Sequence, residues 1–227
     1  MTRLLVLTAV DVEARALARH LGLTRDPTSR WPHFSGGVIE IATVGLRASR
    51  LVERAERFRT HDLCVSAGAC GALAPELSVG ELVVPQVVIG PDSRRWPAAP
   101  LRGLAGAGAL LSVAEVVESA AQKSRLWLET GACAVDMESA AILAWAGGRG
   151  VPAAVVRGVS DDATRGIPAP LAAAVGDDGR VRPLRAVTAA LSRASALGDL
   201  MALRAGTEAA LKAVAGALAR VAREASR

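Results

Sequence analysis

Two apolar runs that end in acidic side chains are the feature of this chain that most constrains its fold. Residues 131–135 form a short apolar run, residues 136–145 repeat apolar side chains at helical spacing, and residues 151–159 are apolar and rich in valine. The lengths and periods predict a strand, a helix and a second buried strand. We expect these elements to form a βαβ unit, whose two parallel strands are joined by a right-handed crossover. The pattern therefore predicts an α/β fold.

Acidic groups stand at the ends of both predicted strands. Asp136 and Glu138 follow the first strand, and Ser160 and Asp161 follow the second. Parallel strands present their carboxyl ends at one edge of the sheet, where α/β folds bind ligands, so we expect these side chains to meet in a crevice. The alternative is that Asp136 caps the helix and that Asp161 lies in a solvated turn.

Five segments carry a family resemblance. Residues 135–142 (VDMESAAI) and 155–161 (VVRGVSD) resemble the signature of the purine nucleoside phosphorylase and methylthioadenosine/S-adenosylhomocysteine nucleosidase superfamily. Residues 8–13, 65–73 and 79–85 resemble its first strand-to-helix turn, its glycine-rich loop and the strand after that loop. The resemblance implies a three-layer α/β sandwich, in which helices flank a central mixed, mostly parallel sheet. It also implies cleavage of the N-glycosidic bond of a purine nucleoside.

Cleavage of this bond makes demands that acidic residues can meet. The ribose becomes cationic and the base leaves as an anion, so the enzyme needs an acid, a clamp on the sugar hydroxyls and a positioned nucleophile. The resemblance implies that Asp161 is the acid, supported by Ser160, and burial would favour its protonated form. It implies that Glu138 binds the ribose and that Glu13 activates a water. The alternative for Glu13 is a purely structural acid in the first turn of a helix.

The same resemblance implies further contacts to the substrate. Met137 would pack against the ribose, and the glycine-rich stretch would bring the backbone N–H groups of Ala69 and Gly71 close to the base or the nucleophile. Many phosphorylases of the superfamily carry phosphate ligands at the positions of Ser66 and Ala69, and this chain has neither. We therefore expect water as the nucleophile and no cofactor, with phosphate as an alternative co-substrate if Arg47 replaces the missing ligands.

Aromatic residues are scarce, with no tyrosine and two phenylalanines. The ring that stacks on the purine in related proteins is missing from residues 112–117, where Val117 and other valines stand instead. Trp31, Trp96 or Trp127 could replace that ring, although tryptophan is more often a core or rim residue. The three histidines are far apart and the three cysteines lack metal-ligand spacing. We expect no metal site.

The last third of the chain points to a subfamily. We expect residues 1–227 to form a single domain, with 184–227 as a helical C-terminal extension that breaks near Gly198. The tail resembles that of the hopanoid-associated nucleoside phosphorylases, which implies release of adenine from adenosylhopane in hopanoid biosynthesis. Alternatives are a methylthioadenosine/S-adenosylhomocysteine or futalosine nucleosidase, and an inactive nucleoside-binding protein of the same fold. The tail could instead pack on the sheet or on a second subunit.

Composition constrains the partners and the location. The net charge is +5, but the arginines that carry it are dispersed, which argues against a nucleic-acid partner. No apolar stretch is long enough to span a membrane, and no signal peptide is evident. We therefore expect a cytoplasmic homodimer or higher homo-oligomer that binds a small, possibly lipid-linked nucleoside. Its positive charge would allow weak peripheral membrane association.

Overall fold

The computed structural model describes residues 1–166, 176–180 and 196–226. Its elements are, in chain order, β1 (Leu4–Thr8), α1 (Asp11–Leu21), β2 (Thr24–Arg25), β3 (His33–Gly36), β4 (Ile39–Thr43), the short 3₁₀ helix η1 (Leu46–Ala48), α2 (Leu51–Ala55), β5 (Leu63–Ala72), β6 (Leu82–Val83), β7 (Val87–Ile89), β8 (Arg95–Pro97), β9 (Ala109–Ser112), α3 (Ala120–Thr130), β10 (Ala134–Asp136), α4 (Ser139–Gly147), β11 (Ala153–Asp161) and α7 (Ala196–Ala225).

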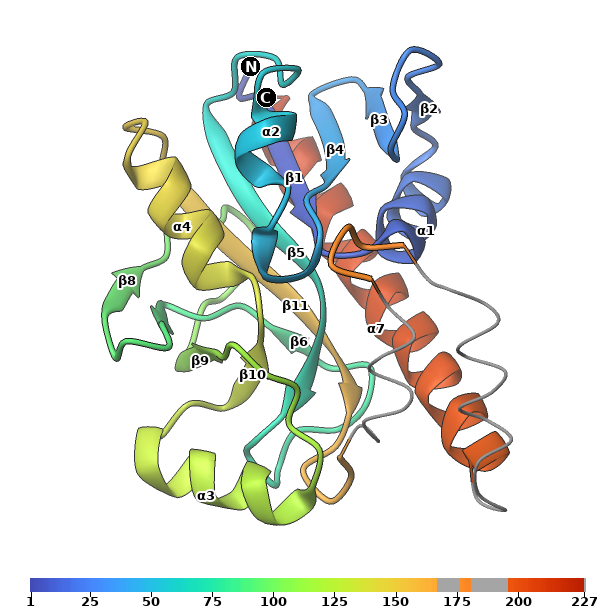
Figure 1. The fold of residues 1–227 in the computed structure, drawn as a ribbon. Coiled ribbons are helices and arrows are strands. Elements are labelled where there is room, and N and C mark those ends of the chain that lie inside the picture. Colours follow the sequence, from blue (N-terminus) through green and yellow to red (C-terminus); the bar gives the residue numbers. More distant parts are fainter. Residues whose placement is uncertain (167–175, 181–195, 227) are drawn as a thin grey trace.

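One mixed sheet runs through the described part of the chain (Figure 1). Its strand order is β2-β3-β4-β1-β5-β10-β9-β7-β8, and β11 pairs with β5 and β6. The neighbours β4, β1, β5 and β11 are parallel, as are β10, β9 and β7. The antiparallel pairings, such as β3 with β4 and β7 with β8, are shorter than the central pairing of β5 with β11.

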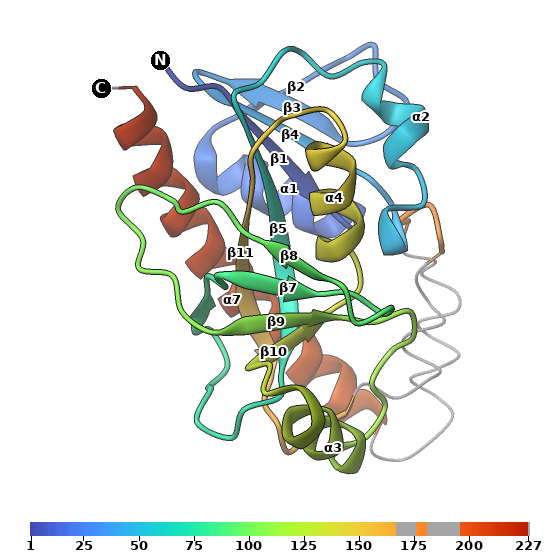
Figure 2. The same ribbon diagram turned by 90° about the vertical axis from the view of Figure 1, so that its left-hand side faces the viewer.

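Helices cover both faces of this sheet. α1 and α7 lie on one face, and α2 and α4 lie on the other (Figure 2). In β1, Leu4 and Val6 pack into the core beneath α1 and α7, whereas Leu5 and Leu7 pack into the core beneath α4. Because both faces are covered, β1 is apolar from Leu4 to Leu7 rather than alternating. The structure confirms the predicted three-layer α/β sandwich.

β5 is the strand around which the site is built. β1 pairs with its first half as far as Ser66, and β10 takes over the same edge at Gly71 and Ala72. β11 pairs with the opposite edge along most of the strand. The stretch that we expected to be a glycine-rich loop is therefore the second half of β5. The difference arises because Gly68 and Gly71 serve close approaches of side chains rather than a turn.

The predicted strand–helix–strand unit is present, but the prediction that its two strands are parallel is wrong. β10 runs antiparallel to β5 while β11 runs parallel to it, so β10 and β11 are antiparallel to each other and do not pair. The right-handed crossover rule applies only to parallel strands, and apolar periodicity carries no information on strand direction. The acidic ends still meet, because Val135 of β10 and Asp161 of β11 are both in register with Gly71.

α7 packs along β11 and α1 and supplies core residues such as Leu211, Val214 and Leu218. The described part of the helix, Ala196–Ala225, continues through Gly198 without a break at that residue, and residues 184–195 lie outside the described residues. The approach to β11 is close enough to require glycine. A Cβ on Gly206 of α7 would overlap the Ser160 carbonyl.

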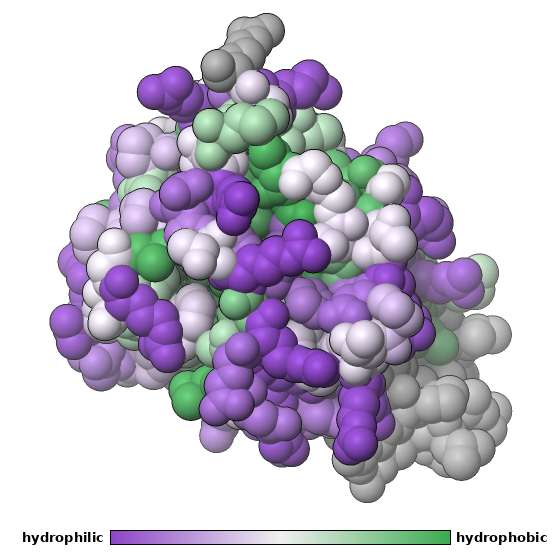
Figure 3. Space-filling view, turned by 90° about the horizontal axis from the view of Figure 1, so that it is seen from above, coloured by the Kyte–Doolittle hydropathy of each residue, from purple (hydrophilic) through white to green (hydrophobic). Residues whose placement is uncertain are grey.

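The two ends of the described chain lie together, where the Thr2 N–H donates to the carbonyl of Ala225 at 3.0 Å. Seen from above, this end of the molecule is covered mostly by hydrophilic side chains, and hydrophobic groups form smaller patches (Figure 3). Among the helices in the described ranges, none has both the length and the apolar composition needed to cross a membrane.

The seating of α7 on β11 predicts a stability effect at Gly206. Gly206→Ala should lower the free energy of unfolding by about 1 to 3 kcal/mol, because the added methyl group forces the helix away from the strand. Urea denaturation followed by circular dichroism measures the change. Gly216→Ala on the same helix is the control, since its methyl group meets open space. It should leave stability unchanged or raise it by about 1 kcal/mol. Equal losses in both variants would contradict this packing.

Candidate active site

A cavity of about 190 Å³ lies where the second half of β5 meets the first turn of α1, the end of β10 and the end of β11. Its lining combines buried carboxylates with small and aliphatic side chains. The eight residues predicted as catalytic or substrate-binding all line it: Glu13, Ala69, Gly71, Val117, Met137, Glu138, Ser160 and Asp161. The structure therefore brings together residues that are up to 148 positions apart in the sequence (161 − 13 = 148).

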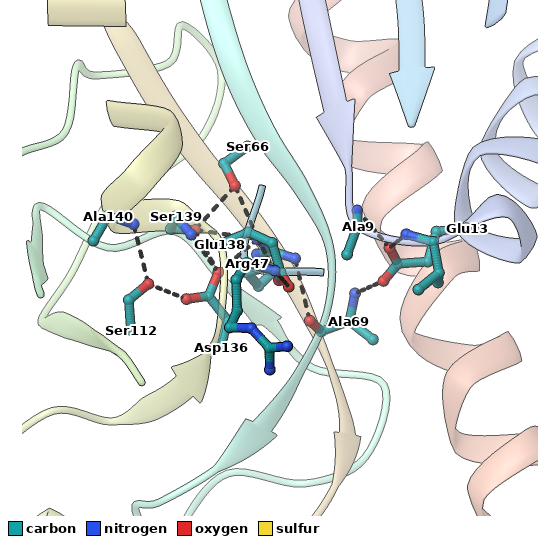
Figure 4. Close-up of polar contacts among 12 residues, drawn as sticks. Ala9, Glu13, Arg47, Ser66, Ala69, Ser112, Asp136, Glu138, Ser139 and Ala140 are labelled. Atoms are coloured by element: carbon teal, nitrogen blue, oxygen red, sulfur yellow. Dashed lines mark hydrogen bonds and ion pairs between the residues drawn. The ribbon is translucent and has the colours of Figure 1, made fainter. Parts of the chain in front are cut away.

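Arg157 of β11 is the buried cation beside the cavity, with 1% of its side chain exposed. Its Nη2 lies 2.6 Å from Asp136 Oδ2 and 3.8 Å from Glu138 Oε2. The same nitrogen donates to Ser66 Oγ at 2.9 Å and to Ser139 Oγ at 3.2 Å. One guanidinium thus connects β5, β10, α4 and β11. Four of the residues in this network are labelled in Figure 4: Ser66, Asp136, Glu138 and Ser139.

Asp136 both lines the cavity and caps a helix, the two roles that the sequence left open. Its Oδ2 accepts from the backbone N–H of Ser139 at 3.1 Å and from Ser139 Oγ at 2.6 Å, so it caps the start of α4. Its other oxygen accepts from Ser112 Oγ on β9. With Arg157 as its ion-pair partner, Asp136 organises the side of the cavity next to Glu138 rather than standing free for a ligand.

Glu13 is fixed by three backbone N–H groups. Its Oε2 accepts from Ala9 at 3.1 Å and from Val10 at 3.2 Å, and its Oε1 accepts from Ala69 of β5 at 2.8 Å (Figure 4). The bonds to residues 9 and 10 are those of a glutamate that reaches back over the start of its own helix. The bond to Ala69 couples α1 to β5. The Ala69 N–H that we expected near the ligand is therefore occupied by Glu13.

Gly68 makes this position of Glu13 possible. Its φ of 149° is one that residues with side chains rarely adopt, and a Cβ there would lie 2.5 Å from Glu13 Oε1 and 2.8 Å from Arg157 Nη1. Only a residue without a side chain allows the carboxylate and the guanidinium to come so close to the strand. Gly68 is thus a requirement of the site rather than of a turn.

Glu138 is held from the opposite side by η1. Its Oε1 accepts from the backbone N–H of Arg47 at 3.0 Å. Arg47 and Ala48 both have a φ of 54°, a conformation that is unfavourable for residues with a Cβ. The guanidinium of Arg47 bonds to Asp177 Oδ1 at 2.7 Å and to the carbonyl of Ala114 at 3.3 Å. Arg47 therefore supports Glu138 through its backbone.

Three carboxylates share the single guanidinium of Arg157. Burial raises the pKa of Glu13, although Arg157 and the three N–H groups oppose the shift. Burial also raises the pKa of Glu138 to about 7; Arg157 opposes this shift, while Asp136 and Glu13 add to it. Burial alone would lower the pKa of Arg157, but the surrounding carboxylates outweigh it and raise that pKa. Arg157 stays charged, and Glu138 takes up a proton near neutral pH.

Asp161 has a partner that the sequence analysis did not anticipate. The side chain of Lys123, from α3, is 1% exposed and its Nζ forms an ion pair with Asp161 Oδ2. Ser160 Oγ lies 2.6 Å from the other oxygen of Asp161, as the resemblance implied, and 3.1 Å from the carbonyl of Cys70. Asp161 is a buried strand residue, so the alternative of a solvated turn is wrong.

Aliphatic side chains complete the cavity. Val113, Val116 and Val117 line it, and no aromatic side chain does so among the described residues. Trp31 packs against His33 and Trp96 lies against Arg94. Trp127 packs in a core cluster with Val113 and Val117 but does not itself line the cavity. None of the three tryptophans replaces the missing purine-stacking ring.

The described ranges contain no group of three His, Cys, Asp or Glu side chains that is arranged to hold a metal ion. The carboxylates beside the cavity are instead engaged with Arg157, with Lys123 and with backbone N–H groups.

Comparison with known proteins places the chain in a family. Residues 104–195 match the family model described as the phosphorylase superfamily. The futalosine hydrolase of Streptomyces coelicolor is 31% identical over 195 residues, which cover 70% of this chain and 83% of that protein. The chain belongs to the nucleoside phosphorylase and nucleosidase superfamily.

Solved structures agree on the fold of the superfamily. The futalosine hydrolase of Helicobacter pylori superposes with a TM-score of 0.71 at 18% identity and covers 98% of both chains. The 5′-methylthioadenosine nucleosidase of Arabidopsis thaliana superposes with a TM-score of 0.68 at 18% identity, covering 99% of this chain and 96% of that one. At this identity the two structures support the fold alone.

The close approach at Gly68 predicts a loss of activity on substitution. Gly68→Ala should lower kcat for a nucleoside substrate at least about 10²-fold, because the new methyl group displaces the carboxylate of Glu13. Steady-state kinetics measure the effect. Gly37→Ala is the control: Gly37 also has a positive φ, 55°, but a Cβ there meets nothing within 4 Å. It should lose some stability and keep its kcat. Wild-type kcat in Gly68→Ala would contradict the role of this glycine.

The raised pKa of Glu138 predicts how stability depends on pH. The folded chain binds this proton more tightly than the unfolded chain, because the pKa is about 7 rather than the usual 4.5. The contribution of this proton to the free energy of unfolding of the wild type is therefore lost as the pH rises from about 4.5 to about 7. Glu138→Gln has no such contribution to lose. Relative to wild type, the variant should gain about 2 kcal/mol between about pH 5 and pH 8. Urea unfolding across this range checks it, and a difference that does not change with pH would contradict it.

Proposed function

We propose that this protein is a nucleosidase that hydrolyses the N-glycosidic bond of a purine nucleoside. The observation that carries the proposal is the convergence of Glu13, Glu138 and Asp161 on one largely aliphatic cavity. These are the three groups that the chemistry requires: a base for water, an acceptor for ribose hydroxyls and an acid for the leaving base. An inactive nucleoside-binding protein would have no use for all three.

Glu13 is the proposed base. Its three backbone hydrogen bonds hold the carboxylate in one orientation, and its raised pKa makes it a better proton acceptor than a solvent-exposed glutamate. In the proposed reaction it takes a proton from the water that attacks C1′ of the ribose. Glu138 lies nearby and accepts from the ribose hydroxyls, while Met137 packs against the sugar. Asp161 faces the purine and protonates the ring nitrogen that becomes negatively charged.

The arrangement favours water over phosphate as the nucleophile. The hydroxyl of Ser66 is bonded to Arg157, and Ala69 has no side-chain donor. The guanidinium of Arg47 is bonded to Asp177 and to the Ala114 carbonyl, so it does not replace the missing phosphate ligands. Three carboxylates surround one guanidinium, so this region would repel a phosphate dianion.

Futalosine is the substrate that we place first. The S. coelicolor relative, 31% identical to this chain, is a futalosine hydrolase. Adenosylhopane, the substrate that the tail suggested, has less support, because the described part of α7 packs on the sheet and contributes no residue to the cavity. The segments 167–175 and 181–195, on which that suggestion also relied, lie outside the described residues.

A substrate panel tests the proposed function. Purified protein is incubated with futalosine, methylthioadenosine, adenosine and adenosylhopane, with and without phosphate, and the released base and sugar are quantified by chromatography. We expect base release without phosphate, an unphosphorylated sugar product and the highest kcat/KM for futalosine. Asp161→Asn, purified in parallel, controls for nucleosidases of the expression host.

Three outcomes would contradict parts of the proposal. A strict requirement for phosphate, with a sugar 1-phosphate as product, would overturn the hydrolytic mechanism. Preference for adenosylhopane over futalosine would return the chain to the hopanoid-associated group. Binding of nucleosides without release of any base would show that the fold has lost its activity.

A further inference from the structure

Lys123 is a buried cation that the proposed reaction does not yet use. Besides its ion pair with Asp161 Oδ2, its Nζ donates to the carbonyl of Asp162 at 2.7 Å and lies 3.4 Å from the carbonyl of Asp161. Every one of these acceptors belongs to the last residues of β11 or the turn that follows. The ammonium group is therefore held against the end of the strand that carries the proposed acid.

The pair presents a problem of proton supply. An acid must carry a proton when the purine leaves, but a carboxylate in an ion pair with an ammonium group has none of its own. Lys123 does have one, in direct contact with Asp161. Cys70, which also lies near Asp161, is no substitute, because burial raises the pKa of its thiol. Among the described residues, the charged groups near this end of β11 include Asp162 and Arg165, which follow the strand, and Glu115, which lines the same cavity.

We infer that Lys123 is a positioning residue that stores the proton which Asp161 delivers to the leaving purine. The inference rests on the proposed function. Asp161 first takes a proton from Lys123 Nζ, which becomes a neutral amine. As the bond between C1′ and the purine breaks, its electron pair moves to the base, which takes that proton from Asp161. The attacking water bonds to C1′ and gives a proton to Glu13. After product release, Glu13 returns a proton to solvent and Lys123 takes one up.

The presence of lysine rather than arginine at position 123 supports a role as a proton donor rather than as a fixed positive charge. This chain has two lysines, Lys123 and Lys212, and all its other basic side chains apart from histidine are arginines. An ammonium group can give up a proton, whereas a guanidinium group does not do so in proteins. Gly71 keeps the pair open to the cavity, since a Cβ there would lie 3.0 Å from Asp161 Oδ2 and 3.3 Å from Lys123 Nζ.

The test compares Lys123→Arg and Lys123→Met with wild type over pH 6 to 8.5, using the best substrate of the panel. Lys123→Arg keeps the charge but cannot release the proton, so its kcat should fall at least tenfold at every pH. Lys123→Met leaves Asp161 to hold the proton alone. Its kcat relative to wild type should fall at least tenfold further as the pH rises across the range. Lys212→Met, an exposed lysine on α7, should match wild type.

A double variant separates this role from a structural one. In an Asp161→Asn background, adding Lys123→Met should change kcat less than twofold, because Lys123 acts only through Asp161. Circular dichroism confirms that each variant is folded. If Lys123→Met does not fold, the kcat of Lys123→Arg still tests the inference. Wild-type kcat in Lys123→Arg would overturn the inference, as would a Lys123→Met defect that does not change with pH. Wild-type protein that cleaves no nucleoside would overturn the proposed function as well.

Discussion

The buried guanidinium of Arg157 is the interaction on which the rest of the site depends. Burial of an unpaired charge is very unfavourable, so Arg157 requires the carboxylate of Asp136, and the carboxylates of Glu13 and Glu138 in turn require a nearby cation. These groups come from α1, β10, the residue before α4, and β11, and Ser66 adds β5. Several elements must therefore be in place before any one of the charges is stabilised. The geometry of the candidate active site therefore forms together with the fold and is not added to elements that are already packed.

Close backbone approaches bring these elements together. At Gly68 the missing side chain lets Glu13 and Arg157 reach the face of β5, and at Gly71 it gives Asp161 and Lys123 their space. The two glycines are three residues apart, which is roughly 10 Å along a strand. A single strand without side chains at these two points therefore makes room for two charge clusters, each of which contributes carboxylates to the lining of one cavity. A glycine also allows a close backbone approach at Gly206, where α7 packs against β11.

The sequence predicted the fold class from its apolar runs and, through the family resemblance, eight of the residues that line the cavity. Apolar runs followed by acidic groups mark strand ends, and the signature VVRGVSD contains both Arg157 and Asp161. Strand direction was not predictable, since β10 and β11 have the same kind of apolar pattern although they run in opposite directions. The ion pair of Lys123 with Asp161 joins residues 38 positions apart, and no periodicity reports such a contact. The scarcity of lysine among so many arginines was the available signal.

The two charge clusters match the separation of charge in the proposed reaction. Around Arg157 the carboxylates outnumber the cation, so this cluster would favour the positive charge that develops on the ribose. In the second cluster, Lys123 offsets the charge of Asp161, and the proposed proton transfer from this pair would serve the departing base as it becomes negative. Breakage of the N-glycosidic bond moves electrons from the sugar toward the base. In the proposed reaction, the carboxylates near Arg157 stabilise the positive sugar, and the proton from the Lys123–Asp161 pair neutralises the negative base. The distribution of charges thus favours the dissociated state over the intact nucleoside, which is the requirement for lowering a barrier rather than merely binding a ligand.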